Sequence, residues 1–88
     1  MILKIIWDPK AEKQLDKLPR DISKRIVKKV KEVAKTGRGI EILKEFKYGF
    51  KIRSGAYRAL VDVLYDSNII IVRVVDHRSK IYKRNKAR

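Results

Sequence analysis

A group of basic side chains stands in the segment FKIRSGAYR, where Lys51, Arg53 and Arg58 follow one another closely. Arginine makes bidentate contacts with phosphate oxygens, and a lysine can hold a phosphate or act as a general base. Like charges that face one another across paired strands cost about 0.2–1 kcal/mol per pair. A bound anion offsets that cost, so the segment predicts a phosphodiester site. A solvated basic strand is the alternative interpretation.

The pairing of the strands decides which of these side chains meet. If the two-residue loops are SG and SN, Lys51 faces Arg58 and Arg58 faces His77 across three adjacent strands. Directly opposed residues share a face of the sheet, and Asp62 would then pair with Arg73. A loop of another length shifts the register and breaks this row.

Two helices are predicted to support these strands. An apolar strand, ILKIIW, leads to Asp8 and Pro9, which favour a helix start because aspartate caps free amides and proline suits the first turn. The first helix ends near Pro19, and Gly37 is the natural stop of the second. The apolar positions recur every three or four residues: Ala11, Leu15, Leu18, Ile22, Ile26, Val30 and Val33.

From Glu41 the apolar period changes to two. The alternating residues Phe46, Tyr48, Phe50 and Ile52 are predicted to face the helices, which directs Lys51 and Arg53 to the uncovered face. Further strands are predicted at 57–65 and 69–76, followed by a frayed basic tail. The predicted fold is α+β, a single domain of residues 1–88. A small antiparallel sheet (strand, helix, helix, three-stranded meander) carries a two-helix hairpin packed on one face.

Composition limits the function classes. The chain has 88 residues with 24 Lys and Arg against 10 Asp and Glu, a net charge of +14. Such an excess indicates an anionic partner: nucleic acid first, an acidic protein second, a membrane surface third. The chain has no cysteine and one histidine, which excludes disulfides, thiolate nucleophiles and common zinc sites. No signal peptide or apolar run of about 20 residues is visible, so we expect a cytoplasmic protein.

FKIRSGAYR followed by VVDHRSKIY resembles the paired motifs of the RelE/ParE toxin superfamily, and IIWDPKAEKQLDKLP resembles its opening strand and helix. The resemblance covers almost the whole chain. It implies a RelE-like fold and a toxin neutralised by a cognate acidic, RelB-like antitoxin in a hetero-oligomer. It also implies one of two activities. The RelE branch cleaves messenger RNA in the ribosomal A site, and the ParE branch inhibits DNA gyrase without nuclease residues.

The resemblance to RelE implies roles for four residues. Lys51 matches the candidate general base, and Arg58 matches the arginine that stabilises the phosphate. Arg78 matches a leaving-group acid or phosphate ligand, and Tyr82 matches the tyrosine that orients the nucleotide. The implied reaction is attack by the 2′-hydroxyl of the RNA, without a metal or other cofactor.

Three further residues complete the predicted RNA-binding set. Arg53 replaces a second lysine of the motif; it can hold phosphate but cannot accept a proton. His77 is a second candidate for the acid or base, and Lys47 is a phosphate contact.

The leading prediction is a ribosome-dependent mRNA endoribonuclease that inhibits translation. The alternatives are a ParE-like topoisomerase inhibitor and a basic RNA-binding module that does not cut. The joint presence of Lys51, Arg58, Arg78 and Tyr82 favours the nuclease. The missing second lysine and the short turn of RSGAYR keep the alternatives open.

Overall fold

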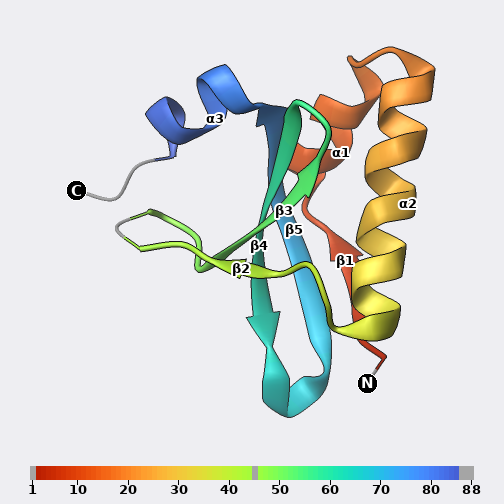
Figure 1. The fold of residues 1–88 in the computed structure, drawn as a ribbon, viewed down its shortest axis with the longest axis vertical. Coiled ribbons are helices and arrows are strands. Elements are labelled where there is room, and N and C mark those ends of the chain that lie inside the picture. Colours follow the sequence, from red (N-terminus) through yellow and green to blue (C-terminus); the bar gives the residue numbers. More distant parts are fainter. Residues whose placement is uncertain (1, 45, 86–88) are drawn as a thin grey trace.

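The structure is a computed structural model that describes residues 2–44 and 46–85 (Figure 1). In chain order the elements are β1 (Lys4–Trp7), α1 (Pro9–Asp16), α2 (Arg20–Thr36), β2 (Glu41–Ile42), β3 (Phe50–Ser54), β4 (Tyr57–Leu64), a 3-10 turn (Tyr65–Ser67), β5 (Ile69–His77) and α3 (Arg78–Arg84). The strands form one sheet in the order β1-β5-β4-β3-β2. In the described part of the chain, no helix has the length and apolar character needed to cross a membrane.

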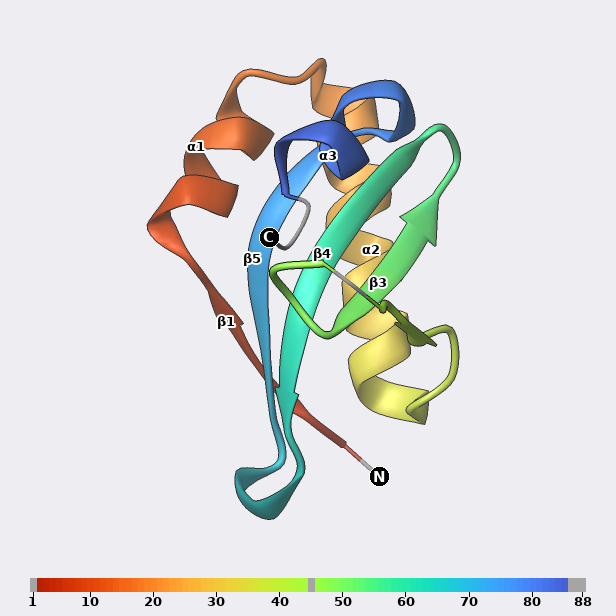
Figure 2. The same cartoon turned by 90° about the vertical axis from the view of Figure 1, so that its left-hand side faces the viewer.

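The α+β fold class is confirmed, and one strand departs from the predicted antiparallel sheet. The pairs β2–β3, β3–β4 and β4–β5 are antiparallel, whereas β1 runs parallel to β5, with Lys4 opposite Ile69. Figures 1 and 2 show α1 and α2 on one side of the sheet and α3 on the other. The sheet is therefore mixed and has helices against both faces.

The predicted helix boundaries are confirmed by their caps. The Asp8 side chain accepts a hydrogen bond from the Lys10 amide at 3.0 Å, and α1 begins at Pro9. Gly37 ends α2 with a φ of 75°, a left-handed conformation that glycine adopts without the steric penalty of a Cβ. Caps of this kind satisfy backbone groups that have no partner within the helix.

The main core lies between the α1–α2 hairpin and the sheet. Its fully buried members include Ala11, Ile26, Val30, Val33, Ile52, Ala59, Val61, Ile70, Val72 and Val75. Ile22, Leu15 and Leu18 are partly buried against them. The helical stripe predicted from the sequence thus packs as expected, because apolar residues at a spacing of three and four occupy one side of a helix.

The aromatic alternation after Glu41 was predicted wrongly in part. Strand β3 begins only at Phe50, so Phe46 and Tyr48 do not belong to it. Tyr48 packs against a second core, formed by Leu60, Val74 and Ile81 on the opposite sheet face. The prediction assumed one covered face, and the second core gives apolar side chains a place on the other.

The C-terminal segment was also predicted wrongly. It forms α3, and its Ile81 is fully buried in the second core. The His77 side chain accepts from the Ser79 amide at 3.1 Å and so caps the helix. Buried Asn85 donates to the Ile81 carbonyl at 2.8 Å and accepts from the Lys47 amide at 2.9 Å. Residues 86–88 of the predicted tail lie outside the described residues.

Both hairpin turns differ from the predicted loops. Ser54 pairs with Tyr57, so the first loop is Gly55 and Ala56, and Gly55 has a φ of 58°. Glycine with positive φ at the first loop position is the pattern of a type II′ turn, which matches the twist of paired strands. At the other end Leu64 pairs with Ile69 around the 3-10 turn.

A β-bulge interrupts the ladder between β4 and β5. Leu60 faces Val74 but Val61 faces Val72, which leaves Arg73 as the extra residue. The predicted ion pair between Asp62 and Arg73 is present at 2.9 Å, although Asp62 lies opposite Ile71 in the ladder. Arg73 also contacts Asp8 at 3.3 Å and so links the start of α1 to the sheet.

This linkage predicts a dependence of stability on pH. The Lys10 amide hydrogen bond, followed by Arg73, holds the pKa of Asp8 below its ordinary 3.8. The pKa of Arg73 is raised, chiefly by its hydrogen bond to Asp62. Because the native pKa of Asp8 is the lower one, its stabilisation is present above pH 3.8 and is lost as the pH falls through the native value. Urea unfolding of Asp8→Asn should show a smaller loss of stability on acidification, since asparagine keeps the cap but not the charge.

Asp66→Asn in the exposed 3-10 turn is the matched control for this charge change. It should retain the wild-type acid dependence. An equal effect of both substitutions would show that overall charge, and not the contacts of Asp8, sets the acid response.

Candidate functional site

The sheet face opposite α1 and α2, called the site face below, carries most of the predicted basic residues. Ile52 of β3 is buried in the main core, so its neighbours Lys51 and Arg53 point to the site face. Arg58 of β4 lies directly opposite Arg53, and on its other side it lies opposite Asp76 of β5. The row across the three strands is therefore Arg53, Arg58 and Asp76.

The predicted row of Lys51, Arg58 and His77 is wrong. The loop lies one residue later than predicted, at Gly55 and Ala56, which shifts the partner of Lys51 by two residues, from Arg58 to Leu60. The bulge at Arg73 adds one residue to β5, and one extra residue turns each later side chain to the other face. His77 consequently lies opposite Tyr57, away from the site face, with ring centroids 5.3 Å apart.

Lys51 is held between a carboxylate and an aromatic ring. Its Nζ lies 3.7 Å from Glu41 and 5.4 Å from the centroid of the Tyr82 ring, and its side chain is only 19% exposed. Both contacts are attractive for a cation. The geometry thus brings two of the predicted catalytic residues, Lys51 and Tyr82, into direct contact.

Glu41 is a site residue that the sequence analysis missed. It lies opposite Lys51 in the β2–β3 ladder, and its second oxygen pairs with Arg53 Nε at 3.2 Å. A single carboxylate therefore offsets the repulsion between two of the cations. The alternation of apolar and polar residues that begins at Glu41 could have revealed it. If that alternation continues through paired strands, Glu41 lies on the same face of the sheet as Lys51.

The Arg58 side chain forms hydrogen bonds with the backbone of the β3–β4 turn. Its Nη1 donates to the carbonyls of Gly55 at 2.7 Å and Tyr57 at 2.8 Å. A guanidinium has five N–H donors, so the Nε and Nη2 groups remain for other acceptors. Arg58 is half-buried, and these two hydrogen bonds hold its guanidinium near the turn, on the strand next to Arg53.

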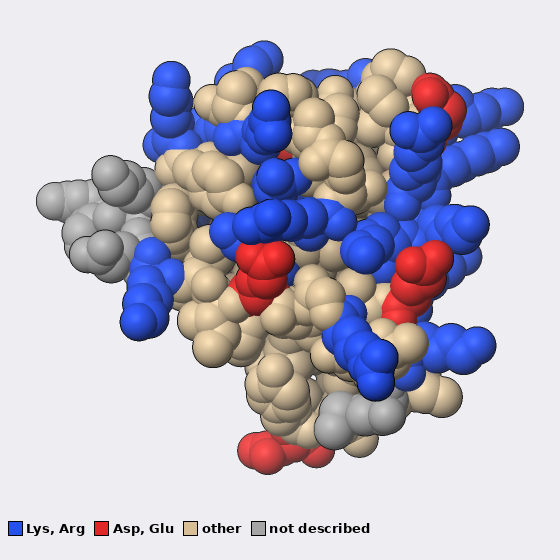
Figure 3. Space-filling model, viewed as in Figure 1, with Lys and Arg blue, Asp and Glu red and all other residues tan. Residues whose placement is uncertain are grey.

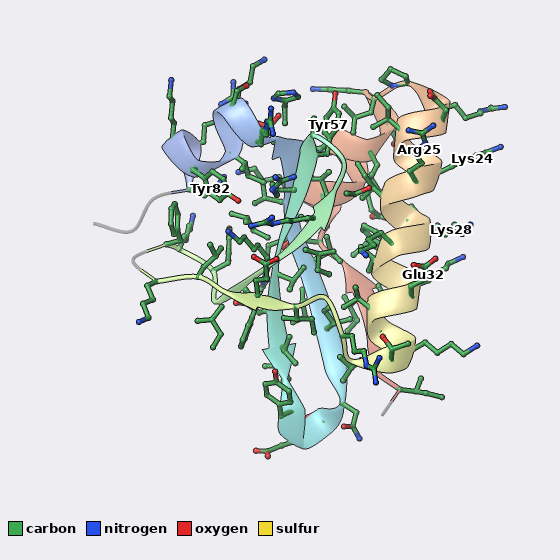
Figure 4. All side chains as sticks on the ribbon, in the orientation of Figure 1. Lys24, Arg25, Lys28, Glu32, Tyr57 and Tyr82 are labelled. Atoms are coloured by element: carbon green, nitrogen blue, oxygen red, sulfur yellow. The ribbon has the colours of Figure 1, made fainter. Side chains whose placement is uncertain are left out.

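Helix α3 adds the C-terminal residues of the predicted set. Arg78 is exposed, and its backbone amide donates to Ala56 at 2.8 Å, so the start of α3 is tied to the β3–β4 turn. One helical turn later, the centroid of the Tyr82 ring lies 5.4 Å from the centroid of the Phe46 ring. Arg84 pairs with Asp76 at 3.3 Å. Figure 4 shows Tyr82 extending from α3 toward the sheet.

The remaining predicted residue, Lys47, lies in the segment between β2 and β3. Its side chain is exposed, with Nζ 5.8 Å from the centroid of the Tyr48 ring. The structure thus gathers Lys51 with Tyr82, places Arg53 beside Arg58, and puts Arg78 at the adjoining turn. It does not bring His77 to this face. A basic face that also carries aromatic rings is suited to holding a phosphodiester and the base next to it.

Comparison with protein families gives a match over most of the chain. The profile of the family described as "ParE toxin of type II toxin-antitoxin system, parDE" matches residues 5–82. Among curated proteins, no sequence matches the chain.

Solved structures share the fold. A chain of the RelB–RelE antitoxin–toxin complex from Methanococcus jannaschii is 28% identical, with a TM-score of 0.67 over 88% of this chain and 94% of that one. A mutant of the E. coli toxin RelE in the free state is 25% identical, with a TM-score of 0.72 over 96% and 98%. The toxin–antitoxin complex RelBE2 from Mycobacterium tuberculosis is 23% identical, with a TM-score of 0.76 over 91% and 97%.

Proposed function

The chain belongs to the ParE toxin family of type II toxin–antitoxin systems, within the RelE/ParE superfamily, and on this premise we propose that it is a RelE-type endoribonuclease. Its substrate would be messenger RNA in the ribosomal A site, and its effect would be to stop translation in the cytoplasm. The similarity to RelE structures supports this activity over that of the ParE branch.

One observation carries the proposal: Lys51 lies against the Tyr82 ring on the same sheet face as Arg53 and Arg58. A nucleotide stacked on Tyr82 would have its 3′-phosphate near the lysine and the arginines. A phosphate there would compete with Glu41 for Lys51 and Arg53, because it offers these cations another anion.

The proposed reaction uses the 2′-hydroxyl of the RNA as the nucleophile. Lys51 takes the hydroxyl proton as the general base, and the oxygen attacks the adjacent phosphorus. Arg53 and Arg58 stabilise the charge that develops on the phosphate oxygens. Arg78 binds on the side of the 5′-oxygen; the bond between that oxygen and phosphorus breaks, the oxygen takes a proton from water, and Lys51 returns its proton to the solvent. The products are a 2′,3′-cyclic phosphate and a 5′-hydroxyl.

We propose an acidic antitoxin as the protein partner. The net charge of +14 would be partly neutralised by such a protein, and structures of similar toxins include RelB–RelE complexes. A partner that binds only the folded toxin also stabilises it by mass action. An acidic reading frame next to this one would agree with the pairing.

Primer extension on messages from programmed ribosomes tests the nuclease activity. The expected result is new 5′ ends within the A-site codon, and these should be absent when ribosomes are left out. Intact messages on ribosomes that carry the toxin would contradict the proposal.

The match to the ParE family profile favours a second candidate, inhibition of a topoisomerase. Supercoiling of plasmid DNA by purified gyrase, with and without the toxin, separates the two. A nuclease should leave supercoiling unchanged, whereas a gyrase inhibitor should reduce supercoiling and leave messages intact.

A further inference from the structure

A basic hollow lies on the far side of the β3–β4 turn from the site face. It has a volume of about 290 Å³ between α2 and the turn, and it is lined by Arg25, Lys28, Lys29, Glu32, Arg53, Ser54 and Gly55. Four of the seven residues are cationic and one is a carboxylate. Its main wall is α2, so it is separate from the contact of Lys51 with Tyr82.

A second hollow adjoins the first. It has about 270 Å³, shares Arg25, Ser54 and Gly55 with the basic hollow, and adds Ile22, Ala56 and Tyr57. Its added walls are mainly apolar, with one half-buried aromatic ring. The turn that both hollows share is open, because a Cβ placed at Gly55 would meet no atom within 4 Å. Figure 4 places Arg25 and Tyr57 on the elements on either side of this region.

We propose that the two hollows together bind a single-stranded segment of RNA. Its phosphates would lie in the basic hollow, and a base would contact Tyr57 and Ile22 in the adjoining one. A basic groove next to an aromatic side chain is the combination that binds single strands, whose bases are free to stack. The inference rests on the proposed function in taking the ligand to be RNA.

Arg53 connects this surface with the site face. It lines the basic hollow, and it also pairs with Glu41 beside Lys51. Arg58 follows at the next strand, with its guanidinium on the carbonyl of Gly55. Figure 3 shows Lys and Arg side chains on the side where α2 lies and across the middle of the view, with few acidic side chains among them. An RNA strand bound along these cations would pass from the two hollows over the β3–β4 turn to the site face.

Binding of a fluorescein-labelled oligouridylate of about ten nucleotides, measured by anisotropy without ribosomes, tests the proposal. The double variant Arg25→Ala, Lys29→Ala should weaken binding by about tenfold or more. It should also reduce the slope of log affinity against log salt by about 1.4, since each single-strand phosphate contact contributes about 0.7. Glu32→Gln should strengthen binding, because it removes the one carboxylate of the hollow.

The double variant Lys24→Ala, Lys31→Ala is the matched control. It removes the same charge from α2, but both residues line a groove on the outer side of the α1–α2 hairpin. Figure 4 shows Lys24 extending away from the sheet. Equal weakening by the two double variants would overturn the inference, because net charge alone would then explain binding. Equal competition by duplex DNA would overturn it as well.

Cross-linking on programmed ribosomes identifies the source of the RNA. A message that carries 4-thiouridine and the ribosomal RNA are analysed separately for cross-links to the peptide with Tyr57. A cross-link to either RNA supports the site and names its occupant, and a peptide free of cross-links overturns it. The two proposals can fail separately. If the wild-type toxin cleaves messages but the double variant Arg25→Ala, Lys29→Ala binds the oligonucleotide as tightly as wild type, this inference is refuted and the nuclease proposal stands.

Discussion

Replacement of Arg58 by alanine is expected to lower the rate of A-site cleavage by about 100-fold or more, the usual effect of losing one donor to a developing oxyanion. Arg58 lies opposite Arg53 on the site face, and its Nε and Nη2 groups are not used by the turn. The measurement is the single-turnover rate on programmed ribosomes, with toxin in excess.

The variant needs two controls, because Arg58 also donates to the carbonyls of Gly55 and Tyr57. The free energy of unfolding must be measured beside the rate, to separate a loosened turn from lost chemistry. Arg20→Ala removes the same side chain from the outer groove of the α1–α2 hairpin, away from the site face and from both hollows, and should lower the rate far less. A rate for Arg58→Ala within a few-fold of wild type would show that the site lies elsewhere.

Ile81→Ala is expected to lower the free energy of unfolding by about 2–5 kcal/mol, the range for truncating a buried isoleucine or leucine. Ile81 is fully buried between Leu60 and Val74, so alanine would leave a cavity beneath α3. The measurement is urea unfolding followed by circular dichroism. Because α3 also carries Tyr82, we expect cleavage to fall with stability.

Ile42→Ala is the matched control for Ile81→Ala. Ile42 is 72% exposed at the edge of the sheet, and its truncation should change stability by no more than about 0.5 kcal/mol. If Ile81→Ala also changed the unfolding free energy by so little, α3 would not unfold together with the sheet. The second core would then contribute to the site but not to global stability.

The sequence alone was sufficient for α1, α2 and the main core. Asp8, Pro9 and Gly37 mark helix ends through local backbone chemistry, which needs no tertiary contact. The stripe that ends at Val33 identifies the buried side of α2 through its period. The alternation of Phe50 and Ile52 likewise predicted that Lys51 and Arg53 lie on the site face.

The sequence could not supply the contacts between distant segments. The residues around Ile81 do not by themselves distinguish a free tail from a packed helix. The helix packs because the apolar sheet face around Leu60 and Val74 buries the Ile81 side chain. The same is true of Glu41, whose role depends on the pairing of β2 with β3.

The difference between the predicted and the observed site comes down to register. Composition and local spacing determined a basic hairpin, because charge and period are properties of neighbouring residues. Tertiary structure decided which of those residues meet, because the extra residue Arg73 turns the side chains that follow it in β5 to the other face of the sheet. That single bulge moves His77 away from the site face and places Asp76 beside Arg58, while the burial of Ile81 anchors the helix from which Tyr82 reaches Lys51.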